Sequence, residues 1–536
     1  MSNALYYGDN LAVLRDSIAD ESVDLIYLDP PFNSNATYNV LFKSPKGNAS
    51  EAQIEAFEDT WHWNIHAEQA FDETIKSGNT DAASLLMAIR SALGDNDMMA
   101  YLAMMAVRLI ELHRVLKPTG SIYLHCDPTA SHYLKVLLDA VFGPANFLNE
   151  ISWKRSSTRS SISRSLRRAH DVILLYTKSP EHTFNLQYRT LSESSLELYK
   201  GHDERGTFQL VPLLVSGIRH GKTGEVWRGV NPNKQGKSGM HWVTIPENLD
   251  QYDKDGRVIW PKKKGGTPRL KYYLEENPGV PLDDFWDDIS LIQSSSSESL
   301  GYPTQKPLAL LARIILSSSN EGDIVLDPFC GCGTATHAAE ALHRHWIGID
   351  ITHLAIGLIE RRLKDTFPGI KFEVHGTPKD FAGAEDLAQR DKYQFQWWAV
   401  TLINAMPYGG KKKGADFGID GYYYCKPDGK KTAAGIVSVK GGENLGVQMV
   451  RDLHGVLERE KSPLGVLITL RDPTDPMVTE AASAGFFETP FGQFPRIQIA
   501  TVEQLLEGKP PKLPPQEKGG GYKQIEPEKP EQESLL

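Results

Sequence analysis

One segment constrains the fold of this chain more than any other: residues 321–351, which read EGDIVLDPFCGCGTATHAAEALHRHWIGIDI. The pattern is a short apolar strand, a glycine-rich turn, a helix and a second strand that ends at Asp350. Glycines in such a turn let the backbone approach a ligand closely, and a carboxylate at the end of the second strand can accept both hydroxyls of a ribose. The segment therefore predicts one βαβ half of a nucleotide-binding α/β sheet.

A second strand end with unusual chemistry lies near the N-terminus. Residues 23–28, VDLIYL, form a short run of the kind buried in a parallel sheet, and Asp29, Pro30, Pro31 and Phe32 follow. Proline fixes φ and lacks an N–H, so no helix begins here and the turn is held in one shape. Open α/β sheets bind ligands just past the carboxyl ends of their strands. This turn is therefore predicted to belong to a site.

The order of strands and helices predicts the domain organisation. Strands alternate with helices through residues 1–180 and again through 301–380, which indicates a doubly wound, mostly parallel sheet. Between them, 181–300 breaks into short polar pieces rich in Gly and Pro, which predicts an insertion. A smaller α/β domain is predicted for 385–508, and the tail at 509–536 has too few apolar residues to fold. The fold class is thus a Rossmann-like α/β sheet with an inserted region, plus a smaller α/β domain.

Composition limits the cellular setting. No N-terminal signal pattern is present, and no apolar run approaches the roughly 18 to 20 residues that cross a bilayer. The four cysteines are too few and too irregularly spaced for a disulfide framework. Two of them, Cys330 and Cys332, share a tight turn whose spacing does not match a tetrahedral zinc site. We expect a cytoplasmic protein with no membrane partner.

Charge is distributed unevenly along the chain. The net charge of −10 argues by itself against a nucleic-acid partner. A serine-rich stretch nevertheless concentrates six cations: Lys154, Arg155, Arg159, Arg164, Arg167 and Arg168. Such a local basic face can bind phosphate on an acidic protein, and a solvated loop is the alternative interpretation. These six residues are the candidate DNA contacts.

Three separated motifs resemble one enzyme family. LDPPFN at 28–33, YPTQKP at 302–307 and VLDPFCGCGT at 325–334 occur in the order found in the β-class amino-group DNA methyltransferases. In that family the catalytic motif comes first, a target-recognition insertion follows, and the S-adenosylmethionine motifs come last. The resemblance covers about residues 1–380. It implies a permuted methyltransferase sheet that acts on double-stranded DNA, with a homodimer as one expected assembly.

The resemblance also implies roles for individual residues. Asp350 is expected at the ribose, Asp9 at the adenine end of the cofactor, and Lys306 with its neighbours at the methionine carboxylate. The full set of expected cofactor residues is Asp9, Asn10, Thr304, Gln305, Lys306, Asp327, Phe329, Gly331, Gly333, Thr334 and Asp350. The expected catalytic residues are Asp29, Pro30, Pro31 and Phe32.

The aspartate and prolines suit methylation of an exocyclic amine. Such a nitrogen is a poor nucleophile because its lone pair is delocalised into the ring. If the Asp29 carboxylate and the Pro30 carbonyl each accept an amino hydrogen, the nitrogen recovers its lone pair and the developing positive charge is stabilised. A base inside a duplex must be flipped out to reach such a pocket, and Phe32 is the ring expected to stack on it.

The aspartate form of the motif favours adenine N6 as the target. Cytosine N4 is the alternative, and methylation of RNA or of a protein glutamine amide is a further one. A non-catalytic DNA-binding protein that retains the cofactor fold is the competing class. The intact Asp29 and Lys306 argue against that class.

The smaller domain resembles the Mrr-like branch of restriction endonucleases. GADFGIDG at 414–421 and GIVSVK at 435–440 would place Asp420 and Lys440 in an Mg²⁺ site that activates water. Ser438 occupies the position where the family has an acidic residue, so Asp416, Glu385 or Gln448 would have to assist. An active nuclease would make this one chain a restriction and modification system. The alternatives are a domain that only binds DNA and an unrelated α/β domain.

Overall fold

The structure is a computed structural model in which most of the chain is described. The described residues are 3–31, 37–43, 49–58, 63–155, 169–262, 267–293, 296, 298–300, 302, 304–407, 418–428 and 433–515, with the backbone alone described for 37–43 and 49–58. The predicted site residues outside these ranges are Phe32, Arg159, Arg164, Arg167, Arg168 and Asp416. Contacts divide the chain into two compact units, of which one contains Leu186–Leu282 and the other the described residues on both sides of it.

A nine-stranded sheet forms the centre of the larger unit, in the order β16-β6-β7-β5-β2-β17-β18-β1-β19. Its strands are β1 (Ala4–Tyr7), β2 (Val23–Leu28), β5 (Leu116–Cys126), β6 (Phe147–Lys154), β7 (His170–Thr177), β16 (Phe285–Trp286), β17 (Ile324–Asp327), β18 (His345–Asp350) and β19 (Glu373–His375). Only β7 runs antiparallel to its neighbours β5 and β6 among the described pairings of this sheet. Because β2 pairs in parallel with β17, the two predicted motif strands lie side by side although about 300 residues separate them.

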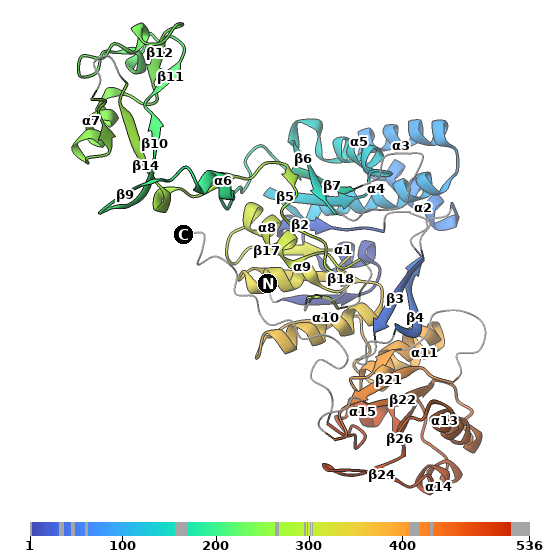
Figure 1. The fold of residues 1–536 in the computed structure, drawn as a ribbon. Coiled ribbons are helices and arrows are strands. Elements are labelled where there is room, and N and C mark those ends of the chain that lie inside the picture. The colour runs from blue at the N-terminus through green and yellow to red at the C-terminus, as the bar shows by residue number, and fades with distance from the viewer. Residues whose placement is uncertain are drawn as a thin grey trace, which may run out of the picture. The chain divides into compact units, whose positions relative to one another are not determined.

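Helices cover both faces of this sheet (Figure 1). One face carries α1 (Asn10–Ser17), α4 (Asp97–Val115) and α5 (Ser131–Phe142), and α2 (Ile65–Lys76) and α3 (Thr80–Leu93) pack on α4. The other face carries α8 (Leu308–Ser318), α9 (Thr334–Ala341) and α10 (His353–Thr366). Alternate residues of β2 enter the two cores, Ile26 on the first face and Leu25 on the second. Burial on both faces explains why the strand reads as a nearly continuous apolar run.

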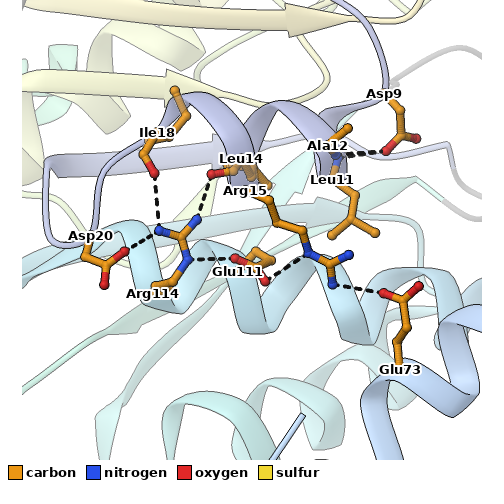
Figure 2. Close-up of polar contacts among 10 residues, drawn as sticks. All are labelled: Asp9, Leu11, Ala12, Leu14, Arg15, Ile18, Asp20, Glu73, Glu111 and Arg114. Atoms are coloured by element: carbon orange, nitrogen blue, oxygen red, sulfur yellow. Dashed lines mark hydrogen bonds and ion pairs between the residues drawn. The ribbon is translucent and has the colours of Figure 1, made fainter. Parts of the chain in front are cut away.

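Ion pairs fasten α1 to α4 (Figure 2). Arg114 of α4 donates to the carbonyl oxygens of Leu14 and Ile18, at 2.7 and 3.2 Å, and so satisfies carbonyls that the end of α1 leaves unpaired. Glu111 of α4 accepts from Arg114 at 2.7 Å and from Arg15 of α1 at 3.1 Å. The C-terminal half of α1 is thereby held against α4.

The unit Leu186–Leu282 has its own small core. Its sheet runs in the order β13-β14-β10-β9, and two-stranded pairs β11-β12 and β15-β8 accompany it. Its elements are β8 (Tyr188–Arg189), α6 (Glu193–Leu196), β9 (Gly201–Asp203), β10 (Gly206–Pro212), β11 (Leu214–Ser216), β12 (Met240–Trp242), α7 (Pro246–Lys254), β13 (Val258–Ile259), β14 (Arg269–Tyr273) and β15 (Val280–Pro281). Buried Trp227 and Trp242 meet edge to face at its centre.

The C-terminal part is a five-stranded sheet in the order β20-β21-β22-β23-β26. Its elements are α11 (Phe381–Arg390), α12 (Lys392–Thr401), β20 (Met406–Pro407), β21 (Gly421–Cys425), β22 (Ala433–Lys440), α13 (Val447–Glu460), β23 (Gly465–Thr469), α14 (Asp475–Ser483), β24 (Phe486–Thr489), β25 (Gly492–Pro495), β26 (Ile497–Thr501) and α15 (Val502–Leu506). Helices α11, α12 and α15 cover one face, and α13 and α14 the other. A hairpin of β3 (Thr37–Lys43) and β4 (Ala49–Glu58) completes the named strands.

The predicted disordered tail divides into two parts. Residues 509–515 lie against this sheet, because Tyr423 Oη donates to the Pro514 carbonyl at 3.0 Å and the Gln498 side chain donates to the Lys512 carbonyl at 2.7 Å. Side chains of the sheet thus supply partners that a count of apolar residues does not reveal. Residues 516–536 lie outside the described part of the chain. None of the described helices is both long enough and apolar enough to cross a membrane.

Candidate active site

A cavity of about 280 Å³ opens at the carboxyl ends of β1, β2, β17 and β18. The predicted residues from the first half of the sheet that line it are Asp9, Asn10, Asp29 and Pro31. Those from the second half are Thr304, Lys306, Asp327, Phe329, Gly331, Thr334 and Asp350. Two motifs that lie far apart in the sequence therefore share one cavity, because β2 and β17 are neighbours in the sheet.

Asp29 and Lys306 form an ion pair in the wall of this cavity. Their side chains are only 15% and 10% exposed, so the pair is largely shielded from solvent. The pair uses Asp29 Oδ2, whereas Asp29 Oδ1 is buried and accepts no hydrogen bond from any described residue. A buried carboxylate oxygen without a donor is costly unless a ligand supplies one. Asp29 therefore has one oxygen paired with Lys306 and one buried oxygen whose hydrogen-bonding capacity is unused.

Asp350 is held by the glycine-rich turn. Its Oδ2 accepts from the Gly331 N–H at 3.0 Å, and its Oδ1 accepts from the Thr352 N–H and hydroxyl at 2.9 and 2.8 Å. Burial raises the pKa of the Asp350 carboxyl to about 6, against these hydrogen bonds, which lower it. The carboxylate is ionised at neutral pH and points into the cavity from the end of β18.

Asp327 differs from Asp350 in its protonation. Burial raises the pKa of the Asp327 carboxyl to about 8, and the nearby carboxyls of Asp29 and Asp350 add to the effect, while the Phe329 N–H opposes it. At neutral pH Asp327 therefore keeps its proton. Of the four groups described so far in the cavity wall, Asp327 is then neutral, while Asp29 and Asp350 are the carboxylates and Lys306 is the cation.

The start of α1 forms another part of the wall. Asp9 Oδ1 caps α1 by accepting from two first-turn amides at 2.9 and 3.3 Å (Figure 2), and Asp9 Oδ2 accepts from buried Arg108 at 2.8 Å. Arg108 also donates to Asn10 Oδ1 at 2.6 Å, and Asn10 donates to the Pro328 carbonyl at 2.8 Å. Both predicted residues thus join the start of α1 to α4, and Asn10 also joins them to the turn after β17.

Three predicted residues do not line the cavity with their side chains. Gln305 bonds the backbone of its own loop, donating to the Glu298 carbonyl and accepting from the Leu300 N–H, each at 2.8 Å. Pro30 is buried beside the cavity. Gly333 precedes α9 with φ +75, and a Cβ there would lie 2.6 Å from Ile359 Cγ1, so only glycine fits. Gln305 shapes its own loop and Gly333 shapes the glycine-rich turn, and neither residue lines the cavity.

Tyr27, Arg108 and Tyr302 are among the lining residues that sequence reasoning did not assign to the site. Arg108 left a signal, because it interrupts the mostly apolar run 98–110, and a buried cation needs a partner. Tyr27 Oη bonds the ring of His125 at 2.9 Å, and this contact joins residues from two strands. Tyr302 belongs to the YPTQKP motif, but its ring lies next to Gly331 only because the tertiary fold brings the two segments together. The sequence alone therefore did not indicate this contact.

Two of the six predicted DNA contacts, Lys154 and Arg155, are described. Lys154 ends β6 and is exposed, and the Arg155 N–H donates to the Ala169 carbonyl at 2.8 Å. The Arg155 guanidinium pairs with Asp171 at 3.3 Å. Strand β6 runs in the same direction as β2, because both β6 and β5 oppose β7. Lys154 and Asp29 therefore both lie at the carboxyl ends of the parallel strands, on the same side of the sheet.

Of the candidate metal residues in the C-terminal part, Asp420 and Ser438 contact each other. Asp420 precedes β21, and its Oδ2 accepts from the Val439 N–H at 2.7 Å and from the Ser438 hydroxyl at 3.3 Å. Lys440 ends β22. Glu385 pairs with Arg471, and the Gln448 side chain donates to Asp452.

This donor set does not fit a divalent cation. Within the described ranges, no three or more His, Cys, Asp or Glu residues gather to hold an ion. Asp420 Oδ2 already accepts hydrogen bonds from the Val439 N–H and the Ser438 hydroxyl inside the sheet. Asp416 lies outside the described residues.

Comparison with known families agrees with this geometry. The DNA methylase family model matches residues 23–361, a span that includes both motifs around the cavity. The chain belongs to the DNA methylase family. A restriction endonuclease model matches residues 387–490. The two predicted family resemblances and the predicted fold class are confirmed, whereas the individual residue roles, the domain boundaries and the homodimer stay predictions.

Curated relatives carry related names. The type II methyltransferase M.EcaI of Enterobacter cloacae is 32% identical over 367 residues, which is 68% of this chain and 69% of that enzyme. The StyLTI Mod subunit of a type III restriction-modification enzyme from Salmonella typhimurium is 29% identical over 355 residues, and the match spans half of that subunit. A solved structure of a modification methylase from Thermus thermophilus, complexed with S-adenosyl-L-methionine, is 16% identical over 69% of this chain and 99% of its own, with a TM-score of 0.32.

Proposed function

We propose that this DNA methylase transfers a methyl group from S-adenosylmethionine to N6 of an adenine that is flipped out of double-stranded DNA. One observation carries the proposal. Asp29, with a buried and unpartnered carboxylate oxygen, opens into the same cavity as the glycine-rich turn and Asp350. The group that activates an amine and the groups suited to a nucleoside cofactor are thus next to each other.

The residues present fit the cofactor. S-adenosylmethionine supplies an electrophilic methyl group on a sulfonium when it is bound. Asp350, ionised at neutral pH, would accept the ribose hydroxyls, and Phe329 and Gly331 would contact the nucleoside across the turn. The Asp29 carboxylate favours a cationic centre nearby. Thr304 and Lys306 would lie by the carboxylate end of the cofactor, as the motif predicts.

Asp29 would orient the target amine. Lys306 anchors Oδ2, so the carboxylate cannot rotate freely, and Oδ1 is left to accept one amino hydrogen. The Pro30 carbonyl would accept the other, and the two prolines keep these acceptors at a fixed separation. Held in this way, the nitrogen directs its lone pair toward the methyl group instead of into the ring. The preorganised carboxylate stabilises the positive charge that grows on the nitrogen.

Adenine is favoured over cytosine by the aspartate at position 29. The family motif with serine there usually accompanies cytosine N4, and this chain has Asp29. Cytosine N4 is the alternative target. Digestion of methylated DNA to nucleosides, followed by mass spectrometry, separates N6-methyladenine from N4-methylcytosine in one experiment.

A surface loop of the inserted unit offers a second place for DNA contacts. Arg219, Lys234 and Lys237 of the loop 217–239 are exposed. Asn233 ties the loop together, because its side chain accepts from the Arg219 N–H at 3.2 Å and donates to the Arg219 carbonyl at 3.0 Å. Exposed cations on a fixed backbone suit phosphate or base-edge contacts. We assign target recognition to this unit on that basis.

The restriction endonuclease match favours a second candidate function, DNA cleavage by the C-terminal part. Cleavage that depends on Mg²⁺ would make the chain a combined restriction and modification enzyme. The donor set around Asp420 argues against it. We therefore expect methylated and unmethylated plasmid to stay intact with the purified protein in Mg²⁺ or Mn²⁺. Cleavage of the unmethylated plasmid alone would establish the second function.

The main test compares the wild type with Asp29→Asn and Asp29→Ala. We expect transfer of labelled methyl groups to DNA by the wild type and none by either variant. Binding of S-adenosylmethionine, measured by calorimetry, should stay within about threefold of wild type, because Asp29 is assigned to the amine and not to the cofactor. Retained methylation in either variant would refute the role of Asp29.

A further inference from the structure

One hydrophobic cluster joins the glycine-rich turn of the cavity, called the cofactor loop here, to the C-terminal part that the restriction endonuclease model matches at residues 387–490. That part is called the restriction-type domain below. The cluster contains Tyr302 and Cys332, which line the cavity, and Trp397, Met406 and Tyr424 from α12, β20 and β21. All five side chains are less than 9% exposed. Residues of the cofactor cavity are therefore packed in one core with residues of the other domain.

Helix α10 supplies the second connection. Its Leu354 and Leu358 belong to the same cluster. Buried Arg362 donates to the Cys332 carbonyl at 3.1 Å, which fixes the glycine-rich turn to α10 from behind. On its other side α10 contacts α12, where the Gln394 side chain accepts from the His353 N–H at 3.3 Å. One helix thus touches the cofactor loop and the restriction-type domain.

The chain direction strengthens this connection. Helix α10 begins shortly after Asp350, the predicted ribose ligand, and Thr352 both caps α10 and donates to Asp350. On the far side, β21 begins immediately after Asp420. A shift of α10 against the turn would therefore move both the Asp350 region and the packing around β21.

We infer that the restriction-type domain is a structural part of the cofactor pocket, and that Trp397 is a positioning residue that holds the Cys332 turn in its binding conformation. The inference rests on the proposed use of S-adenosylmethionine. Packed interiors transmit displacement because they have few voids, so loss of the Trp397 ring would let the turn relax away from the ligand. Linkage makes the effect reciprocal: cofactor binding must tighten β21.

Adjacent tryptophans provide a matched control. Trp397 lies in the shared cluster, whereas Trp398 lies in the core of the C-terminal sheet, and both are 4% exposed. Trp397→Leu and Trp398→Leu therefore remove the same ring from the same helix but on different sides. In each full-length variant, calorimetry measures the affinity for S-adenosylmethionine and circular dichroism confirms folding. Met406→Ala, on the shared cluster, replaces Trp397→Leu if that variant does not fold.

We expect Trp397→Leu to weaken cofactor binding by about 5- to 20-fold and Trp398→Leu to leave it near wild type. Hydrogen exchange of the β21 amides should slow when S-adenosylmethionine is added to the wild type and should not respond in Trp397→Leu. Equal affinities in all three proteins, or equal losses in both variants, would overturn the inference while leaving the methylase function intact. No binding to the wild type would overturn the proposed function and the inference with it.

Discussion

Two aspartates at the edges of two sheets are used in opposite ways. Asp29 follows a central strand of the methylase sheet, and its Oδ1 is buried with no donor among the described residues. Asp420 precedes β21 in the restriction-type domain, and its Oδ2 accepts two hydrogen bonds from the neighbouring strand. Asp29 thus has a carboxylate oxygen without a donor, which we propose binds the target amine, whereas Asp420 Oδ2 accepts hydrogen bonds that stabilise its own sheet.

The difference follows from the residues opposite each carboxylate. Lys306 meets Asp29 with a cation that pairs with one oxygen and leaves the second, buried oxygen without a hydrogen-bond donor among the described residues. Ser438, where a nuclease of this type has an acidic residue, meets Asp420 with a hydroxyl that donates to it. An acidic residue would repel Asp420 and the pair would need a cation, while the hydroxyl satisfies Asp420 without one. A family match alone therefore does not establish that a metal site survives.

The largest expected effect comes from replacing Asp29 with its amide. Asp29→Asn keeps the volume but replaces the anion, so charge on the amine is no longer stabilised, and kcat for methyl transfer should fall by at least about 100-fold. Single-turnover transfer of labelled methyl groups to DNA measures it. Thr304→Ser, at the same cavity wall with its hydroxyl kept, is the control and should stay within about threefold. A similar fall in both variants would mean that the cavity is merely sensitive to any change.

The fold was predictable where local chemistry decides it. Apolar runs that end in aspartate, and glycines at positive φ such as Gly331 and Gly333, mark the strands and the cofactor turn in the sequence itself. Contacts made through the sheet were not predictable. The Asp29–Lys306 pair joins residues 277 apart, and the Ser438–Asp420 bond depends on the register of β21 against β22. Gln305 was predicted to bind the cofactor together with its motif neighbours Thr304 and Lys306, but its amide hydrogen-bonds the backbone of its own loop.

A pH titration tests a third aspartate, Asp350 of the methylase sheet. Burial raises the pKa of Asp350 from 3.8 to about 6, so the carboxylate proposed to accept the ribose hydroxyls is lost as the pH falls below about 6. Affinity for S-adenosylmethionine should be constant from about pH 6 to about pH 7, where neighbouring Asp327, with its pKa raised to about 8, keeps its proton. Below about pH 6 the affinity should fall by up to about tenfold per pH unit, and calorimetry from about pH 5 to about pH 7 measures this.

The same titration of Asp350 should change protein stability in the opposite direction to cofactor affinity, which provides a check. Because folding raises this pKa, the folded state binds the proton more tightly, and the group's contribution to the free energy of unfolding falls as the pH rises from 3.8 to about 6. Asp350→Asn removes the titrating group, so its weaker cofactor binding should be flat over the same range. A flat wild-type profile would remove Asp350 from the ribose site.

Asp420 should affect stability rather than chemistry. Asp420→Ala leaves the buried Val439 N–H without its acceptor, which costs about 1 to 3 kcal/mol of unfolding free energy. Urea denaturation, followed by the fluorescence of the tryptophans, measures it. At saturating cofactor kcat should be unchanged. A variant that keeps its stability but loses a measurable Mn²⁺ affinity of the wild type would instead place a metal at Asp420.

The smallest expected effect tests which edge of the methylase sheet meets DNA. Lys154 lies at the Asp29 edge, and Lys117 lies near the start of β5, at the opposite edge, because β5 runs parallel to β2. Each variant, Lys154→Ala or Lys117→Ala, removes one positive charge. If Lys154 contacts a phosphate, its loss should weaken DNA binding about two- to fivefold and lower the slope of log K against log salt concentration by about one, while Lys117→Ala should change neither.

Lys117 also pairs with Asp24, so its variant needs a separate stability measurement. Equal small losses in both would indicate a general effect of net charge, and DNA would then have to approach the cavity by contacts other than the end of β6.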